Sequence, residues 1–208
     1  MTMAVRKISL AKPIFDEEMK QAALGALEHD RYTKGENVFK FEEEFARYIG
    51  VKYAVSTNSG TAALHIALIA LGLKPGDEVV TTPLSFIATA NSVIHAGAIP
   101  KFADIRFEDY GMDPALVSEA ISDRTRALLP VHLFGYPADL DGLREVHDSK
   151  GLSLVEDACQ AHGAVFKGRQ VGSFGDVGCF SFYPSKNLWV PGDGGMATTN
   201  DEDLARVM

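Results

Sequence analysis

An acid and a lysine stand at the two ends of residues 155–186, each shortly after an apolar run. Asp157 follows the run Leu152–Val155, and Lys186 follows the strand-like segment Val177–Phe182. Glycines and turn residues fill much of the space between them. A pyridoxal phosphate (PLP) site requires these two groups. The lysine forms a Schiff base with the cofactor, and the acid keeps the pyridinium nitrogen protonated so that the ring acts as an electron sink.

Spacing alone also fits a plainer interpretation. An Asp at the end of a strand often caps a turn, and an exposed Lys is often only a solvated charge. Taken by itself, the stretch favours this plainer interpretation. The case for a PLP site therefore depends on what the surrounding elements bring to the same place.

Predicted strands and helices alternate along the chain. Apolar residues at helical spacing predict helices over residues 15–29, 38–49, 62–73, 85–96, 113–121 and 138–149. Short apolar runs predict strands over residues 52–56, 78–81, 99–105, 124–133, 152–156 and 177–182. This alternation predicts an α/β fold, with a mostly parallel sheet and helices on both faces. The acids Glu42–Glu44 of the second helix are expected to form a solvated face.

Ligands of such sheets bind beyond the carboxyl ends of the strands. Polar residues fall at these ends in several places: Asn58–Thr61, Asp104, His132, Asp157 and Ser181. The small polar turn before residue 62 leads into a helix, whose first N–H groups and dipole favour an anion such as phosphate. An ordinary Ser or Thr cap is the alternative there.

Composition sets further limits. The 208 residues suffice for one good-sized domain, and 46% are hydrophobic and 23% charged, as in ordinary globular proteins. A net charge of −8 argues against a nucleic-acid partner. Cys159 and Cys179 lack metal-ligand spacing, so we expect no metal site and a reduced, cytoplasmic setting. Residues 1–13 have no signal-peptide core, and Ala62–Leu73 is too short to cross a membrane.

A series of segments, in conserved order along the chain, resembles the DegT/DnrJ/StrS family of PLP-dependent sugar aminotransferases. The resemblance runs from about residue 8 to the end. It is carried by NSGTAALH (58–65), PGDEVVTTPLSFIATAN (75–91), VHLFG (131–135), VEDACQAHGA (155–164), FSFYPSKNL (180–188) and GDGGMATTN (192–200). It implies the fold of the PLP-transferase large domain, a three-layer α/β/α sandwich of the aspartate aminotransferase type.

The resemblance also implies a role for each matching residue. Lys186 resembles the Schiff-base lysine that shuttles the proton, and Asp157 the partner of the pyridinium nitrogen. The other matches are Gln160 at the ring hydroxyl, Gly60 and Thr61 at the phosphate with Ser181 adding a hydroxyl, and Phe86 stacking on the ring. Phe86 could equally be plain core, and His162 matches a position near the cofactor to which we assign no step.

Departures from the family pattern concern the substrate. Asp193 stands where the family often has a glutamate, and Trp189–Pro191 replaces small polar residues. The resemblance places these positions on the way to the active site, so they affect which sugar binds. A dehydratase branch of the family replaces the lysine with histidine, so Lys186 favours transamination.

The resemblance implies a homodimer that moves an amino group from an amino acid, by resemblance glutamate, to a keto sugar that is linked to a nucleotide. Such reactions serve amino-sugar or cell-surface polysaccharide biosynthesis. Residues 201–208 read as a helix that has just begun, so residues 1–208 are expected to be a truncated large domain without the family's C-terminal small domain. The alternative is a truncated or regulatory relative that keeps the fold without catalysis.

Overall fold

The computed structural model describes residues 12–208, and its centre is a seven-stranded sheet. The strands are β1 (Tyr53–Thr57), β2 (Glu78–Thr81), β3 (Ile99–Phe102), β4 (Thr125–Leu129), β5 (Ser153–Asp157), β8 (Val177–Ser181) and β9 (Gly195–Thr199). Their order across the sheet is β1-β9-β8-β5-β4-β2-β3. All neighbours from β8 to β3 pair in parallel, and only β9 pairs antiparallel with β8 and β1. The predicted mostly parallel sheet is confirmed.

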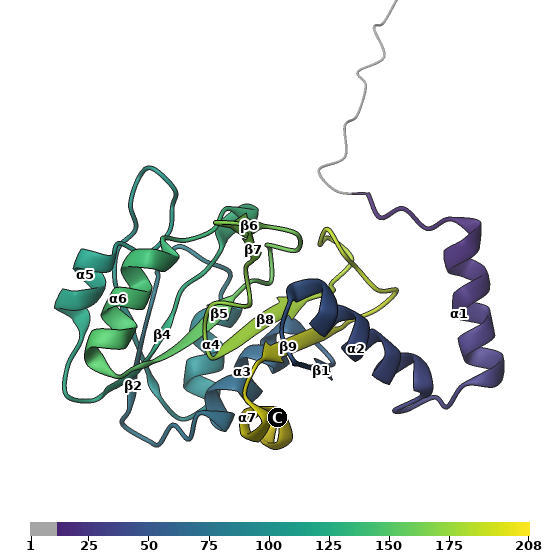
Figure 1. Ribbon diagram of the computed structural model, residues 1–208, viewed down its shortest axis with the longest axis horizontal. Helices are drawn as coiled ribbons and strands as arrows, with labels where there is room; N and C mark the ends of the chain where they lie inside the picture. Colours follow the sequence, from purple (N-terminus) through teal and green to yellow (C-terminus); the bar gives the residue numbers. More distant parts are fainter. Residues whose placement is uncertain (1–11) are drawn as a thin grey trace, which may run out of the picture.

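Helices cover both faces of this sheet (Figure 1). On one face lie α3 (Gly60–Ala70) and α4 (Ala88–His95). On the other lie α2 (Glu36–Ile49), α5 (Pro114–Ala120) and α6 (Leu140–Lys150), while α7 (Glu202–Val207) packs beside β1 and β9. The predicted helices are therefore all present, with Asp113 and Asp139 as the N-caps of α5 and α6.

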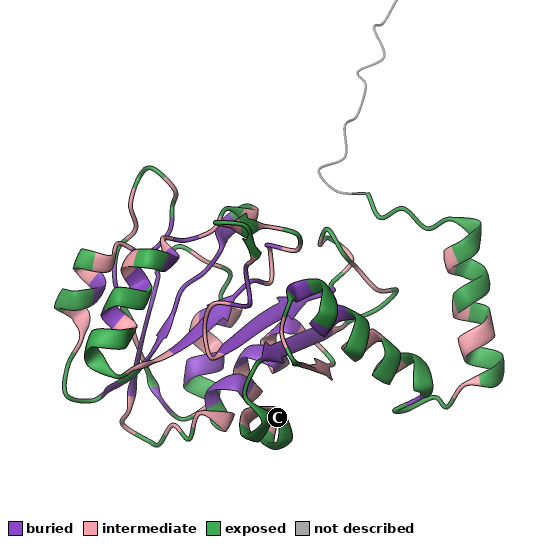
Figure 2. Cartoon of the chain, in the orientation of Figure 1, coloured by how far each residue is buried: buried purple, intermediate pink, exposed green. Residues whose placement is uncertain are grey.

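Alternation along the strands explains why two helical layers are needed. Val79, Val155 and Val177 pack toward α3 and α4, whereas their neighbours Val80 and Leu154 pack toward α5 and α6. Successive side chains of a strand point to opposite faces, so a strand that is apolar at every position must be covered twice. The buried strands stand out between the partly exposed helices in Figure 2.

Some element boundaries differ from the prediction for local reasons. Strand β4 ends at Leu129 because Pro130 has no N–H to continue the ladder. Helix α4 begins at Ala88, three residues later than predicted from Ser85, because the Ser85 hydroxyl bonds the Thr89 side chain and does not cap the helix backbone.

Two sheet elements were not predicted at all. Strand β9 lies between β1 and β8, and every residue of Gly195–Thr199 is buried. A hairpin joins β6 (Val165–Phe166) to β7 (Arg169–Gln170), and both turn residues between them have positive φ angles, as tight hairpin turns require. Neither segment has the apolar alternation on which strand prediction depends.

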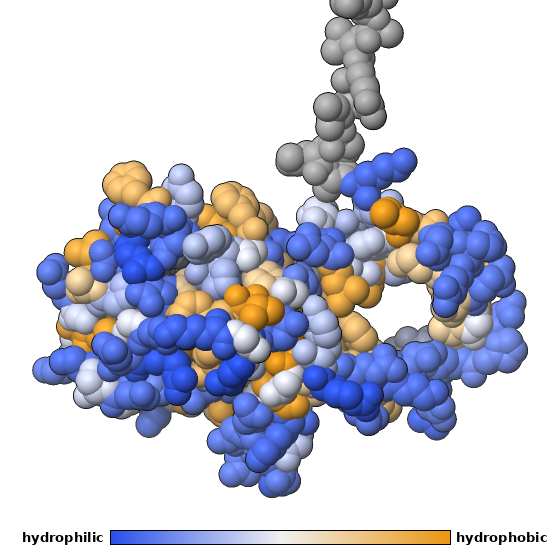
Figure 3. All heavy atoms as spheres, turned by 45° about the horizontal axis from the view of Figure 1, so that its top comes forward, coloured by the Kyte–Doolittle hydropathy of each residue, from blue (hydrophilic) through white to orange (hydrophobic). Residues whose placement is uncertain are grey.

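Helix α1 (Glu17–His29) forms where it was predicted, with Asp16 as N-cap, but it buries no residue. It projects from the sheet (Figures 1 and 3). Its side chains Leu24 and Leu27 are exposed. Asp30 joins α1 to α2, because its carboxylate accepts hydrogen bonds from Glu36 N and Asn37 N.

One of the acids assigned to a solvated face has a structural role. Glu42 Oε1 accepts hydrogen bonds from Ser56 N at 2.8 Å and Ser56 Oγ at 2.7 Å, so it ties α2 to β1. The prediction was wrong for Glu42, because a helical pattern does not show which strand the helix will cover. Glu43 and Glu44 are exposed as expected.

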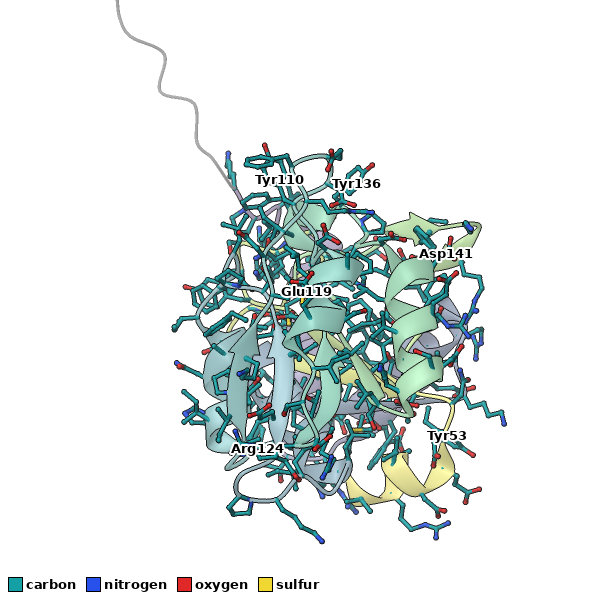
Figure 4. All side chains as sticks on the ribbon, turned by 90° about the vertical axis from the view of Figure 1, so that its left-hand side faces the viewer. Tyr53, Tyr110, Glu119, Arg124, Tyr136 and Asp141 are labelled. Carbon is teal, nitrogen blue, oxygen red and sulfur yellow. The ribbon has the colours of Figure 1, made fainter. Side chains whose placement is uncertain are left out.

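All strands of the seven-stranded sheet except β9 run in the same direction, and this direction matters for the site. Arg124, just before β4, lies at one end of the sheet, and Tyr136, beyond the end of β4, lies at the other, beside Tyr110 (Figure 4).

Between residues 12 and 208, none of the helices combines the length and apolar character that crossing a bilayer needs. The expectation about a signal peptide rests on residues 1–13, of which residues 1–11 lie outside the described part.

The close approach of β8 to the loop at residue 172 gives a stability prediction. A Cβ added to Gly178 would come within 2.6 Å of Thr198 Oγ1 and closer still to the backbone of Gly172. Backbone atoms cannot yield cheaply, so we expect Gly178→Ala to lower the free energy of unfolding by about 1–3 kcal/mol. Urea denaturation measures this loss. Gly25→Ala, at a helical position with open space around it, is the control and should cause no loss.

Candidate active site

A cavity of about 390 Å³ lies at the carboxyl ends of β5 and β8, beside the first turn of α3. It is lined by Gly60, Thr61, Leu64, Ser85, Phe86, Ala88, Thr89, Asp157, Cys159, Gln160, Ser181, Tyr183, Ser185, Lys186 and Asp193. All the residues proposed from the sequence as PLP contacts are in this set. Segments far apart in the chain therefore meet at one place.

The first turn of α3 offers hydrogen-bond donors to this cavity. Ser59 caps the helix by accepting from Ala62 N, and within residues 12–208 the N–H groups of Gly60 and Thr61 have no recorded acceptor. A Cβ on Gly60 would lie 2.6 Å from Ser181 Cβ and 2.7 Å from Cys159 Sγ, so only glycine lets the helix start this close to β8. Free N–H groups at a helix N-terminus, next to the Ser181 hydroxyl, are suited to an anion such as phosphate.

Asp157 is the carboxylate of the cavity and is only 5% exposed. Its Oδ2 accepts a 2.7 Å hydrogen bond from Thr89 Oγ1, and its Oδ1 accepts from Cys159 N at 3.2 Å. A buried carboxylate is costly unless it is paired or hydrogen-bonded, and two donors leave it short of full compensation. This arrangement is suited to a cationic or N–H group of a ligand.

Gln160 is held in one orientation by the loop after β4. Its Oε1 accepts from Phe134 N at 2.9 Å, and Phe134 sits at φ 54°, in the left-handed region. That conformation costs a non-glycine residue about 1 kcal/mol or more and is found where the surroundings enforce it. Because the oxygen of the amide is used, its NH₂ group is left to donate to an oxygen atom in the cavity.

Lys186 lies in the loop after β8 and is half-buried. Its backbone N–H donates to Tyr183 O at 2.8 Å, which closes a tight turn. In the described part of the chain its amine forms no ion pair, so it is not tied up by an acid. Phe86 also lines the cavity, in the loop before α4, and is 67% exposed, so it is not plain core.

The thiol of Cys159 is a wall of the cavity and not a reactive group. Burial, and then the negative charge of Asp157, raise the pKa of Cys159 well above its ordinary value. The thiol therefore stays protonated and packs against α3 as a small apolar group.

Several polar residues at strand ends do not belong to the cavity, which corrects the sequence-based grouping. Asp104 is exposed and turns its carboxylate to Ile105 N. His132 is fully buried and donates from Nε2 to Glu156, because its Nδ1 already accepts from Ala138 N. Position at a strand end does not say whether a side chain points toward the ligand or toward the helices.

His162 also lies outside the cavity, in a neighbouring groove of about 380 Å³ lined by Phe41, Glu44, Phe45, Tyr48, His162, Asn187 and Leu188. Its ring packs near Phe180 and Phe182, with centroids 5.6 and 5.7 Å away. Burial, and then the charge of Lys186, lower the pKa of His162 to about 4. The ring is therefore neutral at physiological pH.

Of the positions that depart from the family pattern, Asp193 lines the cavity. Trp189 does not; its ring faces Phe15, with the centroids 5.9 Å apart.

The sequence analysis did not identify two further residues that line the cavity, Thr89 and Ser85. Neither residue carried a sequence signal, because Ser85 lies in the loop before α4 and the contact of Thr89 with Asp157 joins segments 68 positions apart.

One cavity, beyond the strand ends of an α/β sheet, brings four kinds of group together. They are a half-buried lysine, a buried carboxylate, an amide whose NH₂ group can donate, and N–H groups at a helix N-terminus. These donors fit PLP, which combines an aldehyde, a pyridine nitrogen, a ring hydroxyl and a phosphate. The class of protein that this fold and cavity define is the fold type I PLP-transferase.

The comparisons with known proteins agree, and the chain belongs to the DegT/DnrJ/EryC1/StrS aminotransferase family, whose profile matches residues 13–208. The dTDP-3-amino-3,4,6-trideoxy-alpha-D-glucose transaminase of Streptomyces venezuelae is 48% identical over 188 residues, covering 90% of this chain and 50% of that protein. The chain thus spans about half the length of the curated relatives that it matches.

Solved structures show the same fold. The aminotransferase from Psychrobacter cryohalolentis superimposes with a TM-score of 0.93 at 40% identity, covering 97% of this chain and 51% of that one. NtdA from Bacillus subtilis, solved with bound cofactor PMP, has a TM-score of 0.86 at 34% identity, covering 96% of this chain and 48% of that one.

The buried, neutral His162 predicts how stability depends on pH. Its pKa is lowered from 6.5 to about 4, so the folded state binds fewer protons than the unfolded state between these pH values. The contribution of His162 to the free energy of unfolding is fully present above pH 6.5. It decreases as the pH drops toward 4, by up to about 3 kcal/mol. Denaturation curves of wild type and His162→Gln at pH 7 and pH 4.5 measure the difference.

We expect His162→Gln to lose less stability than wild type on going to pH 4.5. The control is His29→Gln, at an exposed position of α1, which should keep the wild-type dependence. Equal pH dependence in wild type and His162→Gln would contradict the assignment.

Proposed function

We propose that this chain is the PLP-binding part of an aminotransferase that moves an amino group from an amino acid to a nucleotide-linked keto sugar. The observation that carries the proposal is the convergence of Lys186, Asp157 and the α3 N-terminus on one cavity. Membership of a family whose relatives are named sugar transaminases supports it. A regulatory, non-catalytic relative is not favoured by these names.

Each cavity residue has a place in this proposal. Lys186 would hold the cofactor covalently, and Asp157 would face its ring nitrogen. Gly60, Thr61 and Ser181 would donate to the phosphate, the Gln160 amide would donate to the ring oxygen, and Phe86 would cover one face of the ring. When bound, the cofactor supplies an electron sink that stabilises negative charge at the carbon next to the transferred nitrogen.

The proton transfers fall to Lys186. The Lys186 Nζ would take a proton from one carbon of the bound substrate and return it to another, because its stem is tethered at the same cavity. Phe86, which lines the cavity, would lie against the ring and help to keep water away from the reacting atoms. The flexible lysine stem allows this movement, while the turn at Tyr183 fixes where the stem begins.

The substrates follow from the relatives. The curated matches include transaminases of dTDP- and UDP-linked sugars, a GDP-perosamine synthase and a spore coat polysaccharide biosynthesis protein. We propose a nucleotide-linked keto sugar as acceptor, glutamate as donor, and a homodimer in the cytoplasm as the working form. Residues 1–208 would then be the large domain of that enzyme.

Lys186→Ala tests the proposal directly. We expect wild type mixed with PLP to show the absorption band of a covalently held cofactor, and glutamate to convert it to the band of the aminated cofactor. Lys186→Ala should show neither the covalent band nor turnover, because no other amine lines the described cavity. Lys150→Ala, at an exposed position, is the matched control. A covalent band in Lys186→Ala would sink the proposal.

Gln160 gives a second test, of cofactor affinity. In Gln160→Glu the carboxylate can still accept from Phe134 N but cannot donate into the cavity. The variant would lose a hydrogen bond to the charged ring oxygen of PLP and would place a second negative charge beside that oxygen. We therefore expect PLP to bind about tenfold or more weakly. Equilibrium titration with PLP measures this. Gln21→Glu, which adds the same charge on exposed α1, should leave the affinity unchanged; an unchanged affinity in Gln160→Glu would contradict the role.

A further inference from the structure

A chain of hydroxyl groups leads from the cavity to the buried side of Asp157. Thr89 Oγ1 lies 2.7 Å from Asp157 Oδ2, and Ser85 Oγ lies 2.7 Å from Thr89 Oγ1. Thr89 is 1% exposed, and both Thr89 and Ser85 are among the residues that line the cavity. All three groups therefore sit in one hydrogen-bonded line between the first turn of α4 and the end of β5.

The geometry sets the direction of each hydrogen bond. A carboxylate only accepts, so Thr89 must donate its one proton to Asp157. Thr89 then has no proton left for Ser85, and Ser85 must donate to Thr89. The hydrogen bond from Ser85 polarises the Thr89 hydroxyl and makes it a stronger donor to the negatively charged Asp157 carboxylate.

The contact is not what local helix chemistry would produce. A threonine within a helix ordinarily turns its hydroxyl to a backbone carbonyl one turn earlier, and a serine at a helix start ordinarily caps the backbone. Here Ile87 is the N-cap position, with no side-chain cap, and Thr89 bonds a residue 68 positions away. The Thr89 hydroxyl is committed to Asp157, and the Ser85 hydroxyl, in the loop before α4, is committed to Thr89.

We propose that Thr89 and Ser85 are positioning residues that orient the Asp157 carboxylate and keep it charged for the ring nitrogen of the cofactor. This inference rests on the proposed function. With Oδ2 held by Thr89 and Oδ1 receiving only the 3.2 Å contact from Cys159 N, the carboxylate rotamer is fixed. A hydrogen bond to a carboxylate also stabilises its charged form, which is the form that would pair with a protonated ring nitrogen.

The test compares variants that remove or keep the hydroxyl. Thr89→Val has nearly the same shape but no donor, Thr89→Ser keeps the donor, and Ser85→Ala removes only the second hydroxyl. Ser92→Ala is the matched control, because Ser92 is a buried hydroxyl of the same helix that donates to Thr89 O and does not touch Asp157. PLP affinity and the pH dependence of the bound-cofactor band are measured for each.

We expect Thr89→Val to bind PLP about tenfold to a hundredfold more weakly, the usual effect of a lost hydrogen bond to a charged group. Without that donor the ring nitrogen carries less positive charge, so the protonated form of the covalent band should persist to a pH about one unit higher. Ser85→Ala should move both quantities in the same direction by less, and Thr89→Ser should restore them toward wild type.

Two results would overturn the inference while leaving the proposed function intact. One is a Thr89→Val variant with wild-type affinity and pH dependence. The other is a Ser92→Ala variant that shifts the band as much as Thr89→Val, which would show that any loss in this helix has the same effect. A wild-type protein that forms no covalent band with PLP would instead overturn the proposed function, and this inference with it.

Discussion

The structure depends on the buried carboxylate of Glu156, one residue before Asp157. Glu156 accepts from the backbone N–H groups of Gly172, Phe174 and Gly175 at 2.7–2.8 Å and from His132 Nε2 at 3.0 Å. Burial opposes its charge, but the hydrogen bonds from His132 and the backbone lower its pKa overall. These bonds fix the end of β5 against β4 and the 172–175 loop. Because neighbouring side chains alternate, Asp157 is thereby aimed at the opposite face, where α4 supplies Thr89.

Much of the fold could be predicted because its causes are local. Asp113–Pro114 is a favoured helix start, with an acid as cap and Pro at the first position. The alternation of strands and helices leaves few arrangements besides a doubly covered parallel sheet. Lys186 and Asp157 could be placed at strand ends by the same logic. The resemblance to a family added the remaining contacts, Gly60, Thr61, Phe86, Gln160 and Ser181, which no spacing rule would have separated from ordinary caps and core residues.

What the sequence could not reveal depends on contacts between distant segments. Strand β9 forms by pairing with β1 and β8, segments distant in the chain that its own residue pattern does not point to. Glu42 was taken for a solvated acid because its partner, Ser56, lies on the strand that α2 happens to cover. Thr89 was invisible as a site residue for the same reason: a threonine in a helix carries no mark of the carboxylate it will meet.

The chain and its proposed ligand both carry negative charge, and the residues lining the cavity suggest how the ligand would still bind. The chain carries −8, yet the cofactor brings a phosphate. Among the residues lining the described cavity, Lys186 is the only cation, and it is assigned to the aldehyde. The phosphate would therefore be held by neutral donors, the N–H groups of Gly60 and Thr61 and the Ser181 hydroxyl. Such donors select by geometry and the helix dipole, so binding should depend less on ionic strength than binding by surface lysines or arginines would. An acidic surface then repels free polyanions without weakening the one anion that fits.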